Sequence, residues 1–400
     1  MAEILKRDAF SKRSEELRDE IIKDRRWLHE HPELSFEEKE TTAYIAKRLT
    51  ELGIETELFP EYTGALATIH GAAPGKTVLL RADIDALPVP EATALPFASN
   101  TEGKMHACGH DCHAAMLLGA AKLLSESRQE LCGTVKLLFQ AAEESCVGSR
   151  YYVEHGCLDD VDAVFGLHVW GSMAAPFVNI QEGYRMAACD NFKITVRGYA
   201  AHGSTPQLSQ DAIVAASSII LNLQTFASRR NDPLNPFVLT VGTIASGTQF
   251  NIIADTAVME GTIRSFSPEV RKRTESGIRL ITEETAKALG CTAELEYMPV
   301  EEAVINSSPG LTRLAERAAE KLFGREVLCS TEPVTCSEDF SNYLEIKPGV
   351  FVFLGCLNPE LGITAPNHSE HFTVDESILP RGSALYAQFA ADFLKQEAEA

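Results

Sequence analysis

A short segment around residue 110 is rich in metal-binding side chains. The run MHACGHDCH, residues 105–113, contains three histidines and two cysteines, directly ahead of an apolar run that predicts a helix. Thiolate and imidazole are donors that zinc-like divalent ions prefer. Because Cys108 and His110 stand two residues apart in an irregular segment with a glycine, their side chains can converge on one ion or on two adjacent ions. His106 and His113 fit less well, and we interpret them as supporting or structural residues.

Two further stretches place metal-binding groups where a strand is expected to end. The run GTVKLLFQ, residues 133–140, leads to Glu143 and Glu144, and AVFGL, residues 163–167, leads to His168. In an open α/β sheet, ligands bind outside the carboxyl ends of the strands. We therefore expect these groups to share one site with the cysteine and histidine segment, and we interpret the chain as a metallohydrolase.

The adjacent carboxylates Glu143 and Glu144 suggest a division of roles. One can bind metal while the other takes a proton from water and returns it to the leaving group. Consecutive strand residues point to opposite sides of a sheet, so the two cannot easily share one role. Their spacing does not say which role each has. On an exposed loop, such a pair would be only a solvated acidic spot.

Asp83 is the last residue of a nearly continuous apolar run, residues 77–83, which predicts a strand buried on both faces, and Asp85 follows two residues later. The two aspartates lie on one face of an extended chain. We interpret Asp83 as a residue that orients a ligating imidazole or a bound water. The alternative is a capped turn, where aspartate is common. The pair His29 and His31 precedes a proline at a helix end, and we interpret it as structural.

The elements that must position these residues fall into two patterns. Buried strands alternate with helices in the first part, which predicts a doubly wound α/β domain. From residue 188 the strands alternate apolar and polar residues, and their β-α-β-β-α-β order resembles the ferredoxin-like motif. We therefore expect a catalytic domain formed by residues 1–187 and 301–400, with an inserted domain formed by residues 188–300.

Composition excludes some classes of protein. A chain of 400 residues is too long for one ordinary core, which agrees with two domains. The net charge of −21 argues against a nucleic-acid partner, because phosphates need a basic surface. No apolar run is long enough for a membrane span, and the N-terminus lacks the apolar stretch of a signal peptide. Ten cysteines without an export signal indicate reduced thiols and a cytoplasmic location.

Six motifs together resemble one known family. They are RADIDALP, MHACGHDCHAAMLLGAA, GTVKLLFQAAEE, GLHV, AAHGSTP and NHSEHFTVDE. Their order and spacing resemble the metal-dependent aminoacylase and carboxypeptidase family, in the branch of hippurate hydrolases, N-acetyl-amino-acid deacetylases and plant auxin-conjugate hydrolases. The likeness runs from about Arg26 to Phe393. It implies a dimetal peptidase-like catalytic domain with an inserted domain that acts as lid and dimerises the protein.

The resemblance also implies a role for individual residues of the catalytic domain. The positions that match the family's metal ligands are Cys108, His110, Glu144, His168 and His368. Glu143 matches the general base and Asp83 the supporting aspartate. The implied cofactor is a pair of divalent ions, and mixed cysteine, histidine and carboxylate donors suit Zn, Mn, Co and Ni alike.

In the inserted domain, the resemblance implies that His202 reaches the partner subunit's active site and polarises the scissile carbonyl. Asn251 and Arg264 match positions that contact the substrate. The expected reaction is hydrolysis of an N-acyl amino acid, with acetyl, benzoyl or indole acyl groups left open, by a homodimer. A carboxypeptidase or dipeptidase on the same scaffold is the first alternative, and a binding protein without turnover is the second.

Overall fold

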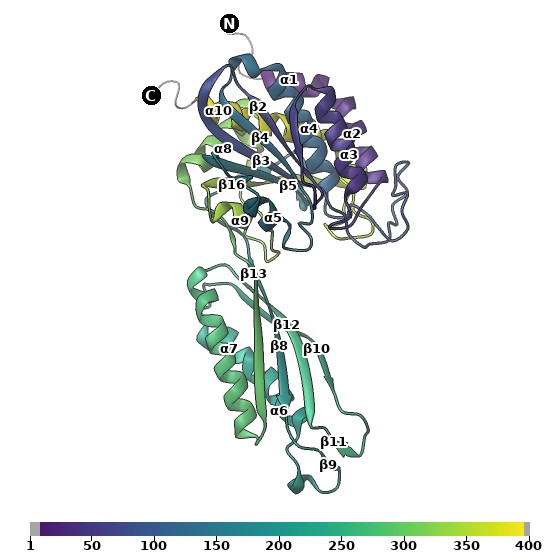
Figure 1. The fold of residues 1–400 in the computed structure, drawn as a ribbon, viewed down its shortest axis with the longest axis vertical. Helices are drawn as coiled ribbons and strands as arrows, with labels where there is room; N and C mark the ends of the chain where they lie inside the picture. Colours follow the sequence, from purple (N-terminus) through teal and green to yellow (C-terminus); the bar gives the residue numbers. More distant parts are fainter. Residues whose placement is uncertain (1–8, 396–400) are drawn as a thin grey trace. The chain divides into compact units, whose positions relative to one another are not determined.

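The computed structural model describes residues 9–395, which form two compact units. Tyr184–Val304 and the short segment Pro333–Glu338 form the smaller unit, and the other described residues form the larger one. The larger unit contains chain from both sides of the smaller unit, so the smaller unit is an insertion in the sequence of the larger (Figure 1). No helix within residues 9–395 is long and apolar enough to cross a membrane.

An eight-stranded sheet is the centre of the larger unit. Strands β3, β4, β5 and β16 run parallel, β2 is antiparallel to β4, and β1 is antiparallel to β2. The strands, in the order of the sheet, are β1 (Glu55–Leu58), β2 (Ala65–His70), β4 (Cys132–Gln140), β3 (Ala73–Asp83), β5 (Ala163–Ala174), β16 (Gly349–Leu357), β6 (Val178–Asn179) and β15 (Leu328–Cys329).

Helices cover both faces of this sheet. On β5, Phe165 stacks on Phe389 of α10 at 4.3 Å, whereas a side chain at the next residue, Gly166, would collide with Phe340 beside α9. Neighbouring strand residues point to opposite faces, so α10 and α9 lie on opposite faces and the predicted doubly wound architecture is confirmed. The helices are α1 (Ala9–Glu16), α2 (Arg18–Glu30), α3 (Lys39–Glu51), α4 (His110–Glu126), α5 (Gly148–Glu154), α8 (Pro309–Phe323), α9 (Ser341–Leu344) and α10 (Leu379–Lys395).

The smaller unit is a four-stranded antiparallel sheet with two helices against it (Figure 1). Its strand order is β10-β12-β8-β13, which is the ferredoxin-like arrangement. Along the chain the elements are β8 (Ala188–Arg197), α6 (Ala212–Thr225), β10 (Phe237–Ser246), β12 (Thr256–Ser265), α7 (Pro268–Ala288) and β13 (Thr292–Glu301). Two small sheets join β9 (Ala201–His202) to β11 (Ile252–Ile253) and β7 (Gly183–Met186) to β14 (Val304–Asn306).

One strand is longer than the sequence pattern predicts. The apolar run 163–167 predicts a strand that ends before His168, but β5 continues through His168 to Ala174. Its neighbour β16 keeps pairing with it as far as Ala174, whereas pairing with β3 ends at Gly166. His168 is therefore not at a strand end; it lies beyond the last residue pair on one side of β5 only.

Candidate metal centre

The registers of three neighbouring strands bring the candidate residues to one row. Asp83 pairs with Gln140 across β3 and β4. Arg81 pairs with Gly166 across the parallel strands β3 and β5. Asp83 and His168 each lie two residues beyond this pair, so they stand at the same level. The loop that begins after Gln140 carries Glu143 and Glu144. Asp83, the loop of Glu143 and Glu144, and His168 inside β5 thus meet at one level of the parallel sheet.

The segment before α4 reaches this level of the sheet because of a glycine. Gly109 has φ +100°, a left-handed conformation, and a side chain there would lie 2.3 Å from Val169 Cγ2. Only glycine allows both the conformation and the close approach of α4 to β5. The turn at Gly109 places Cys108 and His110 on the site, with both residues buried.

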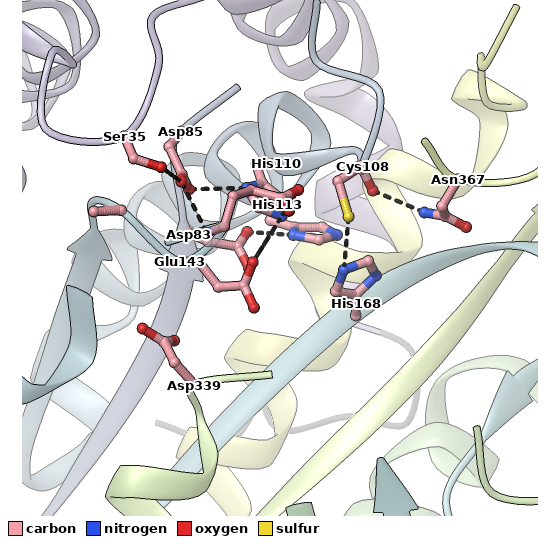
Figure 2. Close-up of polar contacts among 12 residues, drawn as sticks. Ser35, Asp83, Asp85, Cys108, His110, His113, Glu143, His168, Asp339 and Asn367 are labelled. Carbon is pink, nitrogen blue, oxygen red and sulfur yellow. Dashed lines mark hydrogen bonds and ion pairs between the residues drawn. The ribbon is translucent and has the colours of Figure 1, made fainter. Parts of the chain in front are cut away.

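Five side chains converge in the larger unit, and Figure 2 shows three of them, Cys108, His110 and His168. Cys108 Sγ lies 3.5 Å from His168 Nε2, and Glu144 Oε1 lies 3.8 Å from His110 Nε2 and 3.6 Å from His368 Nε2. The donor atoms of Cys108, His110 and Glu144 all lie within 4.8 Å of one another. The structure therefore brings together all five residues that the resemblance implies as metal ligands.

Hydrogen bonds on the outer ring nitrogens fix how two imidazoles face the cluster. His110 Nδ1–H donates to Asp85 Oδ1 at 3.1 Å, and His168 Nδ1–H donates to the carbonyl of Val169 at 2.7 Å. Both Nε2 lone pairs are then directed to the centre, as is usual for histidines that bind metal. His110 Nε2 and Glu144 Oε1 are buried and have no hydrogen-bond partner within residues 9–395. A divalent cation would satisfy both atoms, so the donor set fits a metal.

Asp85, rather than Asp83, contacts the outer nitrogen of His110. Asp83 instead accepts a hydrogen bond from His113 Nδ1–H at 2.5 Å and pairs with Arg81 at 2.6 Å. Its Oδ2 lies 3.7 Å from His110 Nε2, on the side of the ring that faces the cluster. Sequence reasoning saw both aspartates on one face but could not tell their hydrogen-bond partners apart.

His113 cannot serve as a ligand in this arrangement, because Val169 N–H donates to its Nε2 at 2.9 Å and its Nδ1–H is bound to Asp83. His106 has no hydrogen bond at either ring nitrogen among the described residues, and burial lowers its pKa to about 4, which favours the neutral ring. His29 donates to Asp111 beside a buried Arg25–Asp111 ion pair, in agreement with a structural role.

The electrostatics of the cluster favour a cation. Burial and the carboxylates of Glu144 and Glu143 hold the pKa of Cys108 well above its usual range. Burial also raises the pKa of Glu144 to about 7. Burial alone would lower the pKa of His110, but Asp83, Asp85 and Glu144 raise it to about 10. Burial thus disfavours the ionised forms of Cys108 and Glu144, and the carboxylates around His110 favour a positive charge; a divalent ion would stabilise the thiolate and the carboxylates.

His368 reaches the cluster through a constrained loop. Its φ is +68°, which is uncommon for a residue with a side chain, and its N–H donates to Ala107 at 2.7 Å. Its neighbour Asn367 donates to the carbonyl of Cys108 at 2.9 Å and accepts from Gly171 N–H at 2.8 Å. Asn367 therefore ties the loop to two other segments of the site (Figure 2). Sequence reasoning missed Asn367, which appears only as a letter of the last motif.

Glu143 and Glu144 lie in a turn rather than on a strand, so strand alternation is not what separates them. The turn begins after Ala142, whose φ is +59°. Glu144 joins Cys108 and His110 in the cluster, whereas Glu143 Oε2 lies at its edge, 3.9 Å from His110 Nε2. Both side chains are largely buried.

The other predicted residues belong to the smaller unit. His202 is exposed on β9, where its Nδ1 contacts Ser204 Oγ at 2.7 Å, and Gly203 N–H donates to the carbonyl of Asn251. Asn251 Oδ1 is buried without a hydrogen-bond partner among the described residues. Arg264 pairs with Cys189 at the opposite end of β12, where the chain enters the unit. His202 and Asn251 are thus neighbours, and Arg264 is remote from both.

Comparison with known proteins identifies the class to which this fold and site belong. The model of peptidase family M20/M25/M40 matches residues 79–392, and the chain belongs to this family. The resemblance read from the six motifs is therefore confirmed, as is the expectation of a metal-dependent hydrolase with a dinuclear site.

Individual relatives cover nearly the whole chain. An N-acetyl-L-cysteine deacetylase of Bacillus subtilis is 41% identical over 386 residues, which are 96% of this chain and 90% of the relative. Thermostable carboxypeptidase 1 of Saccharolobus solfataricus is 40% identical over 383 residues, or 94% and 96% of the two chains. The crystal structure of the Bacillus subtilis YXEP protein, described as a dinuclear metal binding peptidase, is 38% identical with a TM-score of 0.85 and covers 95% and 99%.

Proposed function

We propose that this protein hydrolyses the amide bond of N-acyl amino acids, releasing a carboxylic acid and a free amino acid. The convergence of Cys108, His110 and Glu144, with unpartnered buried atoms on two of them, is the observation that carries the proposal. The deacetylase relative, which acts on an N-acyl amino acid by its name, supports this substrate class.

The residues that would hold two divalent ions are Cys108, His110, Glu144, His168 and His368. When bound, the ions would lower the pKa of a water molecule and polarise the substrate carbonyl. Glu143 lies at the edge of the ligand cluster, with its Oε2 3.9 Å from His110 Nε2. We assign to Glu143 the proton transfer from the attacking water to the leaving amine. Asp85 would hold His110, and Asp83 would add negative charge beside it.

A homodimer is the second part of the proposal. In the sheet of the smaller unit, the strand β10 has a neighbour on one side only, and Val238 and Ile244 on it are exposed. The exposed face of α6 adds Ile213, Val214 and Leu221. Pairing of two such units across a two-fold axis would cover an open edge and an apolar surface.

The positions of the substrate-contacting candidates also favour a dimer. Eight residues of extended strand, at about 3.3 Å each, separate Arg264 from the end of β12 next to β9 and β11, or roughly 26 Å. His202 and Asn251 lie beyond that end (Figure 1). One small substrate cannot touch both ends of this sheet. We therefore propose that His202 serves the active site of the partner subunit, as the resemblance implies.

We also propose a reducing, cytoplasmic location for the protein, because all ten cysteines are free thiols. Cell fractionation with detection of the native protein tests this directly. Recovery in an oxidising compartment would contradict it.

A substrate panel tests the proposed reaction. Metal-loaded protein should hydrolyse N-acetyl-methionine, N-acetyl-cysteine or hippurate with a kcat/KM at least ~10-fold above that for a Gly-X dipeptide, a difference of about 1.4 kcal/mol in transition-state binding. The carboxypeptidase relative makes peptide hydrolysis the specific alternative. A preference for peptides would replace the proposal with that alternative, and no hydrolysis of any substrate would contradict both.

A further inference from the structure

The loop that carries Glu143 has a backbone conformation that its own sequence does not favour. Ala142 is fully buried and left-handed, with φ +59°, and Cys146 has φ +60°. Non-glycine residues hold such conformations only where the surroundings fix them. Two carboxylates from distant segments bind the peptide N–H groups on either side of Glu143. Ala142 N–H donates to Glu38 Oε1 at 2.9 Å, and Glu144 N–H donates to Asp85 Oδ2 at 3.0 Å.

The carboxylate of Glu38 is available for this contact because a different residue, Glu33, caps α3. Glu38 occupies the N-cap position of α3, yet its side chain makes no capping hydrogen bond. Glu33 caps the helix instead, because its two carboxylate oxygens accept from the N–H groups of Glu40 at 3.1 Å and Thr41 at 2.8 Å. The carboxylate of Glu38 is thereby left to reach Ala142, which is 104 residues away in the sequence.

The surroundings of the Glu38 carboxyl group are unfavourable for its ionised form. The residue is fully buried, its second oxygen accepts from the hydroxyl of Thr63 at 2.6 Å, and no lysine, arginine or histidine pairs with it within residues 9–395. Burial raises its pKa to about 7. A buried carboxyl group with no cationic partner is unfavourable for stability, which points to a role in the site.

We propose that Glu38 is a positioning residue for the general base, acting through the N–H of Ala142 to hold the loop of Glu143 and Glu144. The proposal rests on the proposed function for the role of Glu143. The hydrogen bond from Ala142 N–H needs an acceptor oxygen on a side chain of the right length, and it does not need that side chain to be charged. Misplacement of a reacting group by about 1 Å can lower turnover by on the order of 10²-fold.

Two conservative variants separate reach from charge. Glu38→Gln keeps the acceptor oxygen and the length of the side chain, so kcat should stay within ~3-fold of wild type. Glu38→Asp keeps the charge but is one methylene too short to reach Ala142 N–H. Its kcat should therefore fall by on the order of 10–100-fold with little change in KM. Glu33→Asp is the matched control, because it shortens the other carboxylate that binds two backbone N–H groups in this segment. It should lower the unfolding midpoint without changing kcat.

Amide hydrogen exchange of Ala142 tests the bond without reference to activity. Exchange should be slow in wild type and in Glu38→Gln, and faster in Glu38→Asp. Fast exchange of the Ala142 amide in wild type would overturn the proposal, and so would a normal kcat in Glu38→Asp. A loss of kcat in Glu38→Gln or in Glu33→Asp as large as that in Glu38→Asp would also overturn it. A wild-type protein that hydrolyses no substrate would instead contradict the proposed function, and the exchange rates would still decide whether Glu38 holds the loop.

Discussion

At the scale of single residues, the site is defined by which atom of each side chain is already bound. His110, His113 and His168 stand close together, but their hydrogen bonds leave Nε2 available on His110 and His168 and engage it on His113. The distinction depends on the outer nitrogen of each ring, since a ring that uses both nitrogens has none left for metal. Residue type alone does not contain this information.

Asp85 should determine how tightly the site holds metal. Its two oxygens accept from His110, Ser35 and the N–H of Glu144, so Asp85→Asn replaces one acceptor by a donor and must release at least one of them. We expect metal affinity to fall by about 10–100-fold, as for other residues that orient ligating histidines. Competition with a chelator measures it. Ser35→Ala, which removes one donor to the same carboxylate, is the control, and equal effects of the two variants would contradict the assignment.

The adjacent glutamates should give separable defects. Glu143→Gln cannot accept a proton, so turnover should fall by on the order of 10²–10⁴-fold while bound metal stays near the wild-type amount. Glu144→Gln replaces a charged ligand by a neutral one and should lose metal first. Metal content by mass spectrometry and kcat at saturating metal distinguish the two. Exchanged phenotypes would mean exchanged roles.

At the scale of elements, the position of the site could be predicted from the sequence, but its inner arrangement could not. The runs before Asp83 and Glu143 end where buried parallel strands must end, so their convergence follows from the topology. The apolar run stops before His168, so the sequence predicts a strand end there. The continued pairing of β16 with β5 beyond this point has no signal in the apolar pattern. His368 depends on a left-handed loop held by Asn367, which leaves no periodic signal.

The contact between α3 and the loop of Glu143 should make stability depend on pH. The pKa of Glu38 is about 7 in the folded state, above its usual 4.5, so between these pH values the folded state binds more protons than the unfolded state. Stability contributed by Glu38 is therefore present at low pH and lost as the pH rises to 7.

Urea unfolding of wild type and Glu38→Gln measures this contribution. Relative to wild type, the variant should become more stable by on the order of 1–3 kcal/mol between about pH 5 and pH 8, because glutamine has no proton to lose. Parallel pH profiles for wild type and Glu38→Gln would contradict the assignment.

At the scale of the whole molecule, the resemblance implies that the inserted unit contributes residues to the reaction. The resemblance identified His202, Asn251 and Arg264, yet composition and periodicity gave no reason to choose them. The structure adds that Arg264 is at the opposite end of the sheet from the other two. In the proposed homodimer, one substrate could contact residues from both ends of the sheet, because each end would come from a different chain.

Subunit complementation tests the role of the inserted unit. His202→Ala and Glu143→Gln chains should each be inactive, and mixing them should form heterodimers with one site in which both residues are intact. That site should recover activity in proportion to the heterodimer fraction. The heterodimer is detected by a size tag on one chain. Proven subunit exchange without any recovery would show that His202 acts in its own chain or not at all.

Metal titration of the apoprotein tests the central claim most directly. Protein stripped by a chelator should be inactive, and stepwise addition of Mn²⁺ or Zn²⁺ should raise the rate of N-acetyl amino acid hydrolysis to a plateau at about two bound ions per chain. Bound metal and rate are measured on the same samples. Full activity in the stripped protein, or a filled site that hydrolyses no N-acyl amino acid, would contradict the account.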